Sequence, residues 1–155
     1  MPAAHPTHIR SRWFPPPIGY VKINFDGAIF SNENKASLGV IIRDSSGLAL
    51  ASCSEILSKA YTSNEVEAIA VANALSFAKD LGFTKAVLKG DSLVVIKALL
   101  DEDGYLAPYG LLVEDAKIHS QCFDQLLYSH VKEEGNSVAH CLARYTINIP
   151  NFLDG

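Results

Sequence analysis

The sequence has few cysteines and no long apolar run, and both absences narrow the class of protein. Its three cysteines follow neither a metal motif nor a disulfide framework. An odd, unpatterned set of thiols favours a reducing compartment, in which Cys53, Cys122 and Cys141 would pack as small apolar side chains. No stretch approaches the roughly 20 apolar residues that a membrane span needs, and residues 1–12 lack the apolar centre of a secretory signal. We therefore expect a soluble intracellular protein, nuclear or cytoplasmic, with no membrane partner.

The chain also lacks an excess of basic residues. Thirteen lysines and arginines against 17 acids give a formal net charge of -4. Non-specific binding to nucleic acid usually comes from basic patches, so this charge argues against a strong nucleic-acid binder. A binding groove would have to be lined by the few basic residues available, for which the candidates are Lys22, Arg43, Lys89, Lys97 and Lys132.

Length and composition fit a single folded domain. A chain of 155 residues that is 48% hydrophobic can bury one core of ordinary size but hardly a second. We expect a flexible tail at residues 1–12, a proline-rich lead-in at 13–18, the domain at 19–148 and a C-terminal tail at 149–155. No internal repeat or low-complexity segment is present.

The hydrophobic pattern predicts an α/β fold. Residues 19–28 alternate apolar and polar side chains, which is typical of a strand, and Asp26-Gly27 resembles a turn signal at its end. Residues 62–81 predict the clearest helix, with a capping box at Thr62 and Glu65 and a terminating glycine at Gly82. The other predicted elements are strands near 38–43, 48–57, 84–90 and 123–131, and helices near 92–101, 108–121 and 136–146.

Three acids lie where these elements could aim them at a common point. Asp26 is near the end of the first strand, Asp91 follows the strand near 84–90, and Glu67 begins a buried stripe of the helix at 62–81. Acids at the carboxyl ends of neighbouring parallel strands meet in the usual ligand crevice, and convergent carboxylates suit hard divalent cations. Each acid alone has a structural explanation as a turn residue, a helix cap or a first-turn acid.

Several short segments, in a fixed order, carry a family resemblance. They lie at residues 13–17, 22–28, 39–47, 67–70, 90–92 and 130–144. The chain resembles the ribonuclease H family, specifically the plant branch of reverse-transcriptase-like ribonuclease H domains. The resemblance implies a ribonuclease H-like fold: a five-stranded mixed sheet, with three antiparallel and then parallel strands, flanked by helices.

The resemblance also implies a site that holds two Mg²⁺ or Mn²⁺ ions. It assigns catalytic roles to Asp26, Glu67, Asp91 and His130 and metal ligation to Asp26, Glu67, Asp91 and His140. His140 stands where the family has a fourth acid. Because imidazole is a softer donor than a carboxylate, we expect manganese to outperform magnesium. Expected substrate contacts are Asn64, Lys89, Ser92, Lys132 and Asn136.

The implied function is a metal-dependent endonuclease that cuts the RNA strand of RNA/DNA hybrids and recognises RNA by its 2′-hydroxyl. The family's basic substrate-binding insertion is missing, and residues 101–108 in its place are acidic and turn-like. We therefore expect weak, salt-sensitive binding. The alternative function is a catalytically weak or inactive domain that binds nucleic acid or protein, and His130 has the alternative of a purely structural place in the last strand.

Overall fold

Five strands form one mixed sheet in the order β3-β2-β1-β4-β5. The computed structural model describes residues 19–59, 61–90, 93–100, 110–131 and 137–146. The strands are β1 (Val21–Phe30), β2 (Lys35–Arg43), β3 (Ala49–Leu57), β4 (Lys85–Gly90) and β5 (Gln125–His130). The pairs β1–β2 and β2–β3 are antiparallel, whereas β4 pairs in parallel with both β1 and β5. The predicted mixed sheet is therefore confirmed.

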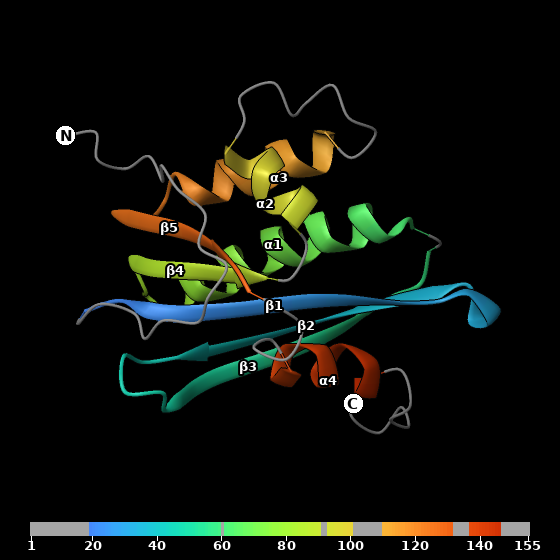
Figure 1. Cartoon of the computed structure of the whole chain (residues 1–155), viewed down its shortest axis with the longest axis horizontal. Coiled ribbons are helices and arrows are strands. Elements are labelled where there is room, and N and C mark those ends of the chain that lie inside the picture. The colour runs from blue at the N-terminus through green and yellow to red at the C-terminus, as the bar shows by residue number, and fades with distance from the viewer. Residues whose placement is uncertain (1–18, 60, 91–92, 101–109, 132–136, 147–155) are drawn as a thin grey trace.

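Helices cover both faces of this sheet (Figure 1). One face carries α1 (Ser63–Asp80), α2 (Leu93–Leu100) and α3 (Gly110–Ser120), and the other carries α4 (Ser137–Thr146). α4 packs on β2, β1 and β3, and α1 packs on β1 and β2. Each predicted helix and strand is present, with ends that shift by at most three residues. Within the described residues, no helix is long and apolar enough to cross a membrane.

The start and end of α1 follow from local side-chain chemistry. The hydroxyl of Thr62 accepts a hydrogen bond from the backbone N–H of Glu65, and the Glu65 carboxylate accepts one from the N–H of Thr62 at 2.8 Å. These two bonds satisfy amide groups that a helix start leaves without partners. Gly82 has a φ of 91°, the left-handed conformation that glycine adopts readily after a helix. Both predicted helix signals are confirmed.

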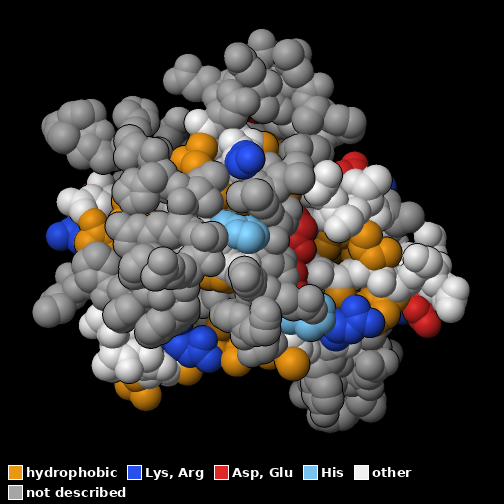
Figure 2. Space-filling view, viewed as in Figure 1, with side chains coloured by type: hydrophobic (Ala, Val, Ile, Leu, Met, Phe, Trp, Pro, Cys, Tyr) orange, Lys and Arg blue, Asp and Glu red, His pale blue; other side chains and the backbone are white. Residues whose placement is uncertain are grey.

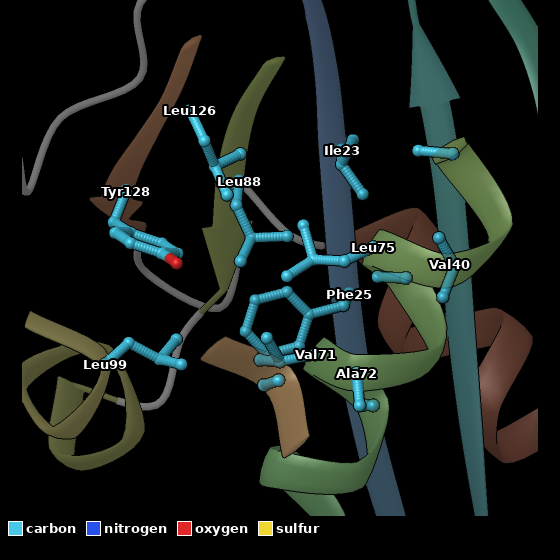
Figure 3. Close-up of a cluster of buried hydrophobic side chains, with 14 of the residues drawn as sticks. Ile23, Phe25, Val40, Val71, Ala72, Leu75, Leu88, Leu99, Leu126 and Tyr128 are labelled. Atoms are coloured by element: carbon cyan, nitrogen blue, oxygen red, sulfur yellow. The ribbon is translucent and has the colours of Figure 1, made fainter. Parts of the chain in front are cut away.

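The main core lies between α1 and the sheet (Figure 3). Phe25, Leu75 and Leu88 are fully buried there and come from β1, α1 and β4. The side of α1 that faces the sheet is rich in alanine, which lets the helix approach closely. Its buried residues are Val66, Glu67, Ala68, Ala70, Val71, Ala72, Ala74, Leu75 and Ala78. One acid, Glu67, therefore begins an otherwise apolar face.

The structure corrects the expected end of the first strand. β1 continues past Asp26 to Phe30, because the antiparallel ladder with β2 runs on to the Phe30–Lys35 pair. Asp26-Gly27 is therefore not a turn. The chain reverses at the short 3-10 helix η1 (Ser31–Glu33), where Asn34 takes the left-handed conformation with a φ of 54°.

The expectation that all three cysteines pack inside is wrong for two of them. Cys122 and Cys141 are exposed, and Cys53 is half-buried. Cys122 lies in the turn after α3, and Cys141 lies on the solvent side of α4. All three are free thiols. Burial raises the pKa of the Cys53 thiol to about 11, and the charge of Glu55 adds to this shift.

Candidate active site

Asp26 projects from the middle of β1 on the face of the sheet that α4 covers. Side chains alternate along a strand, so Asn24 and Asp26 share this face, while Ile23 and Phe25 enter the core on the other. Asp26 is buried, with 3% of its surface exposed. The parallel pairing of β1 with β4 ends at Asn24 and Lys89. Asp26 thus lies just beyond that pairing, near the carboxyl end of β4, where α/β sheets place their ligands.

Glu67 approaches the same stretch of β1 from the first turns of α1. Its side chain is buried, with 6% exposure. The backbone N–H of Gly27 donates a hydrogen bond to Glu67 Oε1 at 3.1 Å. A Cβ at Gly27 would collide with Val66 Cγ1 and lie 3.4 Å from Glu67 Oε1, so only glycine lets α1 come this close. The Gly27 N–H therefore holds the buried Glu67 carboxylate against the backbone of β1, next to the residue that carries Asp26.

His140 completes the described part of the site from α4. Its Nδ1 lies 2.5 Å from Asp26 Oδ2, and 30% of its side chain is exposed. An ionised carboxylate only accepts hydrogen bonds, so Nδ1–H is the donor in this contact. A nitrogen that carries this hydrogen has no lone pair for a cation. His140 can therefore ligate a metal through Nε2, or through Nδ1 only after it releases Asp26.

Two contacts fix α4, and with it His140, on the sheet. The hydroxyl of Ser37 on β2 donates a hydrogen bond to the carbonyl oxygen of Ala143. A Cβ at Gly39 would lie 2.5 Å from the carbonyl oxygen of Ala139 and 2.7 Å from the backbone nitrogen of Ala143. Real Cβ atoms do not come so close to backbone atoms, so α4 can rest on β2 only because residue 39 is glycine.

The described residues offer two carboxylates to a cation, and the third predicted acid, Asp91, lies outside them. Within the described ranges, no three His, Cys, Asp or Glu side chains are close enough to hold a metal ion. Asp26 and Glu67 nevertheless fit one, because carboxylate oxygens are the donors that Mg²⁺ and Mn²⁺ prefer. Their burial adds to this fit, since a nearby cation offsets the cost of burying negative charge.

The other predicted site residues are spread over three elements or lie outside the described residues. His130 is half-buried at the end of β5, where the register pairs it with Gly90, the last residue of β4. Asn64 is half-buried in the first turn of α1. Ser92, Lys132 and Asn136 lie outside the described residues.

Two of the basic residues expected along a groove are inside the protein. Lys22 and Lys89 are 4% and 1% exposed, so they present little charge at the surface. Lys97 on α2 is exposed, and Arg43 at the end of β2 is half-buried. Desolvation by burial, together with the charge of Arg43, lowers the pKa of Lys22 to about 8. Among the described residues, Lys22 and Lys89 therefore cannot form the expected basic groove.

Histidine, acidic and basic side chains gather on one face of the molecule. Figure 2 shows exposed histidine atoms beside acidic atoms near the centre of this face, with a second histidine next to basic atoms below them. Acidic and basic side chains therefore lie close to histidines on the same face.

The backbone contacts at the candidate site were not predicted from the sequence. Gly27 was expected in a turn, and no role was predicted for Ser37 or Gly39. A signal was present for Gly39, since an isolated glycine inside an apolar strand often marks a close backbone approach. No local pattern announces the Ser37 contact, because its partner lies 106 residues away along the chain.

A family model described as reverse transcriptase-like matches residues 24–146. The matched region includes Asp26, Glu67 and His140 and covers most of the chain. The chain belongs to this reverse transcriptase-like family, whose domains have the ribonuclease H-like fold. No curated protein matches the chain.

Solved structures support the same fold. Ribonuclease H1 from the halophilic archaeon Halobacterium salinarum is 28% identical with a TM-score of 0.75, and the match covers 83% of this chain and 98% of that one. The N-terminal ribonuclease H domain of a Mycobacterium tuberculosis protein is 24% identical with a TM-score of 0.71, covering 83% and 94%. A ribonuclease H1 in complex with an RNA/DNA hybrid is 21% identical with a TM-score of 0.67, covering 81% and 94%.

Proposed function

We propose that this chain is a metal-dependent endonuclease that hydrolyses the RNA strand of RNA/DNA hybrids. The observation that carries the proposal is the burial of two carboxylates at neighbouring positions of the chain's fold: Asp26 on β1, and Glu67, which accepts the N–H bond of Gly27, the next residue of β1, at 3.1 Å. Burying two acids is unfavourable for a purely structural purpose. The similarity to ribonuclease H1 structures, one of which is in complex with an RNA/DNA hybrid, points to the substrate.

In this proposal Asp26, Glu67 and Asp91 would hold two Mg²⁺ or Mn²⁺ ions, with His140 as a further ligand. Bound divalent ions lower the pKa of a water nucleophile and stabilise the charge that develops on the phosphate and the leaving oxygen. The protein's own contribution is to fix the donors. The Gly27 N–H holds Glu67, and His140 holds Asp26, so both carboxylates are already restrained before a cation binds.

We assign His130 a role in the late steps of cleavage, in keeping with its place beside Gly90 at the end of the parallel strands. Asn64, Lys89, Ser92, Lys132 and Asn136 are the proposed substrate contacts. Of the two that the structure describes, Asn64 is half-buried and Lys89 is 1% exposed. The net charge of -4 and the buried lysines support binding that is weak and sensitive to salt. Three free thiols support a reducing compartment, nuclear or cytoplasmic.

A cleavage assay tests this function. A labelled RNA/DNA hybrid is incubated with wild type, Asp26→Asn and Asp115→Asn, each with magnesium, with manganese and with EDTA. Asp115 is an exposed acid on α3, so its variant makes the same charge change away from the site. We expect wild type and Asp115→Asn to cut the RNA strand only with metal, and Asp26→Asn to be slower by about 100- to 1,000-fold.

Duplex DNA and duplex RNA serve as substrate controls, since hybrid specificity requires both strands to be recognised. Absence of cleavage with either metal, together with retained binding to the hybrid, would instead support the binding module. Cleavage that is equally fast in Asp26→Asn contradicts the proposed site.

A further inference from the structure

An arginine on α4 stacks on an aromatic ring beside the candidate site. Arg144 follows His140 by one helical turn, so the two side chains share one side of α4. Phe30 follows Asp26 by four residues on β1, so strand alternation puts both on the face that α4 covers. The guanidinium carbon of Arg144 lies 5.3 Å from the centroid of the Phe30 ring, within cation–π distance. The Arg144–Phe30 pair therefore lies next to the Asp26–His140 pair, on the side nearer the β1–β2 hairpin.

The charge of Arg144 is not neutralised by an acid in the described part of the chain. Arg144 belongs to neither the His140–Asp26 pair nor the Lys117–Glu114 pair. Its side chain is exposed. The Phe30 ring therefore holds the guanidinium in place but leaves its positive charge available to a ligand.

Stacking also leaves the hydrogen-bond donors of Arg144 accessible. The ring attracts the cation through its π face and does not replace a phosphate as hydrogen-bond acceptor, so the guanidinium N–H groups can still bind a ligand. This planar fork matches two oxygens of a phosphate group. Because the side chain is already ordered by Phe30, it loses less freedom when a phosphate binds.

The site needs such a cation. Asp26 and Glu67 repel an approaching phosphodiester, and the chain as a whole carries a net charge of -4. The lysines expected to offset this charge, Lys22 and Lys89, are buried. Arg144 is an exposed cation on the same helix face as the residue that contacts Asp26.

We propose that Arg144, held over the Phe30 ring, binds a phosphodiester of the substrate next to the one that is cleaved and thereby positions it. The proposal rests on the proposed nuclease function and adds a substrate-positioning residue to it. Phe30 acts through Arg144 as its support.

The test compares wild type with Arg144→Gln, Arg144→Lys and the control Lys85→Gln. Lys85 is an exposed cation at the start of β4, the end of that strand opposite Gly90, so its variant makes the same charge change far from Asp26. Binding of a labelled RNA/DNA hybrid is measured by fluorescence anisotropy at several salt concentrations in EDTA, where the hybrid stays intact. Cleavage kinetics are measured separately with manganese.

We expect Arg144→Gln to reduce the slope of log K against log salt by about one, as for the loss of one phosphate contact. Its KM should rise roughly tenfold while kcat changes by less than about threefold. Arg144→Lys keeps the positive charge but loses the planar fork of donors. Its KM should therefore lie between those of wild type and Arg144→Gln. Lys85→Gln should match wild type. Equal slopes and KM values for Arg144→Gln and Lys85→Gln would overturn the proposal.

Phe30→Leu tests the support separately, because it keeps an apolar residue and the Arg144 charge but removes the ring. We expect about a threefold rise in KM in this variant and no further rise when Arg144→Gln is added to it. Additive effects would overturn the role of Phe30. A wild type that binds the hybrid without cutting it defeats the nuclease function, yet the salt slope still decides the role of Arg144. A wild type that does not bind the hybrid at all overturns both.

Discussion

The two faces of the sheet are built from the same strands and have opposite characters. Toward α1, the strands bury only apolar side chains, among them Ile23, Phe25, Val40 and Leu88. Toward α4, the same strands bury Lys22, Asn24, Asp26, Ser37 and Lys89. Buried polar groups stabilise a fold only when other groups satisfy them, whereas apolar burial is favourable by itself. The comparison indicates that the α1 face supplies most of the apolar core, while the proposed chemistry draws on Asp26 from the α4 face together with Glu67 from α1.

Phe25→Ala gives the largest expected effect, and it acts on stability. Phe25 is fully buried and its ring fills the space beside Gly90, where a Cβ would lie 2.6 Å from Phe25 Cε1. We expect the free energy of unfolding to fall by about 3–5 kcal/mol in a urea titration. The neighbour on the other face, Asp26→Asn, should lose activity but less than about 1 kcal/mol of stability. A larger stability loss for Asp26→Asn than for Phe25→Ala would reverse the assignment of the two faces.

Gly39→Ala should disturb the α4 face by moving a whole helix. The added Cβ would meet backbone atoms of Ala139 and Ala143, which cannot swing aside as a flexible side chain could. We expect a loss of about 1–3 kcal/mol of stability. Activity should also fall at temperatures where the variant stays folded, because α4 carries His140 away from Asp26.

The matched control for this variant is Ser54→Ala. Ser54 is exposed on β3 and pairs with Gly39 in the register, so the control changes the same part of the sheet but removes a hydroxyl and adds no atom that could displace α4. Unfolding and hybrid cleavage are measured for both variants. A Gly39→Ala protein as stable and active as Ser54→Ala would show that α4 does not depend on this close approach.

Most of the fold was predictable because its signals are local. The capping box at Thr62 and Glu65, the glycine at 82 and the alternation in β1 each depend on a few neighbouring residues. The end of β1 was not predictable in this way. Asp26-Gly27 has the sequence of a turn, but the antiparallel ladder with β2 extends the strand four residues beyond Asp26. Long-range pairing overrode the local preference.

The elements that carry two of the acids were predictable, but the contacts that support them were not. Asp26 was expected on the first strand and Glu67 early in the helix at 62–81, and both placements are confirmed. Their role as metal ligands stays a prediction. The contacts of His140 with Asp26 and of Arg144 with Phe30 each join residues 114 positions apart, and no sequence spacing encodes them. The burial of Lys22 and Lys89 was likewise unpredictable, since lysine inside a strand usually marks the solvent face.

Lys22→Met tests whether a buried charge on the α4 face makes the stability of the protein depend on pH. The pKa of Lys22 is lowered from 10.5 to about 8 by burial and by Arg43, so the folded state binds fewer protons than the unfolded state between these values. The contribution of Lys22 to the free energy of unfolding is therefore lowest below about pH 8 and rises as the pH increases toward 10.5. We expect wild type to gain on the order of 1 kcal/mol relative to Lys22→Met across this window, measured by urea unfolding at each pH. A constant difference between the two proteins would mean that Lys22 titrates normally.

The smallest expected effect concerns the choice of metal. If His140 contributes a nitrogen ligand, manganese should outperform magnesium in hybrid cleavage, because magnesium prefers oxygen donors. His140→Asp replaces that nitrogen by carboxylate oxygen and should lower the manganese-to-magnesium rate ratio roughly threefold. The control is His119→Asp, a change of the same kind on α3. Equal wild-type rates with both metals, or a ratio that His140→Asp leaves unchanged, would leave His140 only its observed role of holding Asp26 Oδ2 at 2.5 Å. The polar face would then bind metal through its acids alone, with α4 acting as a support for them.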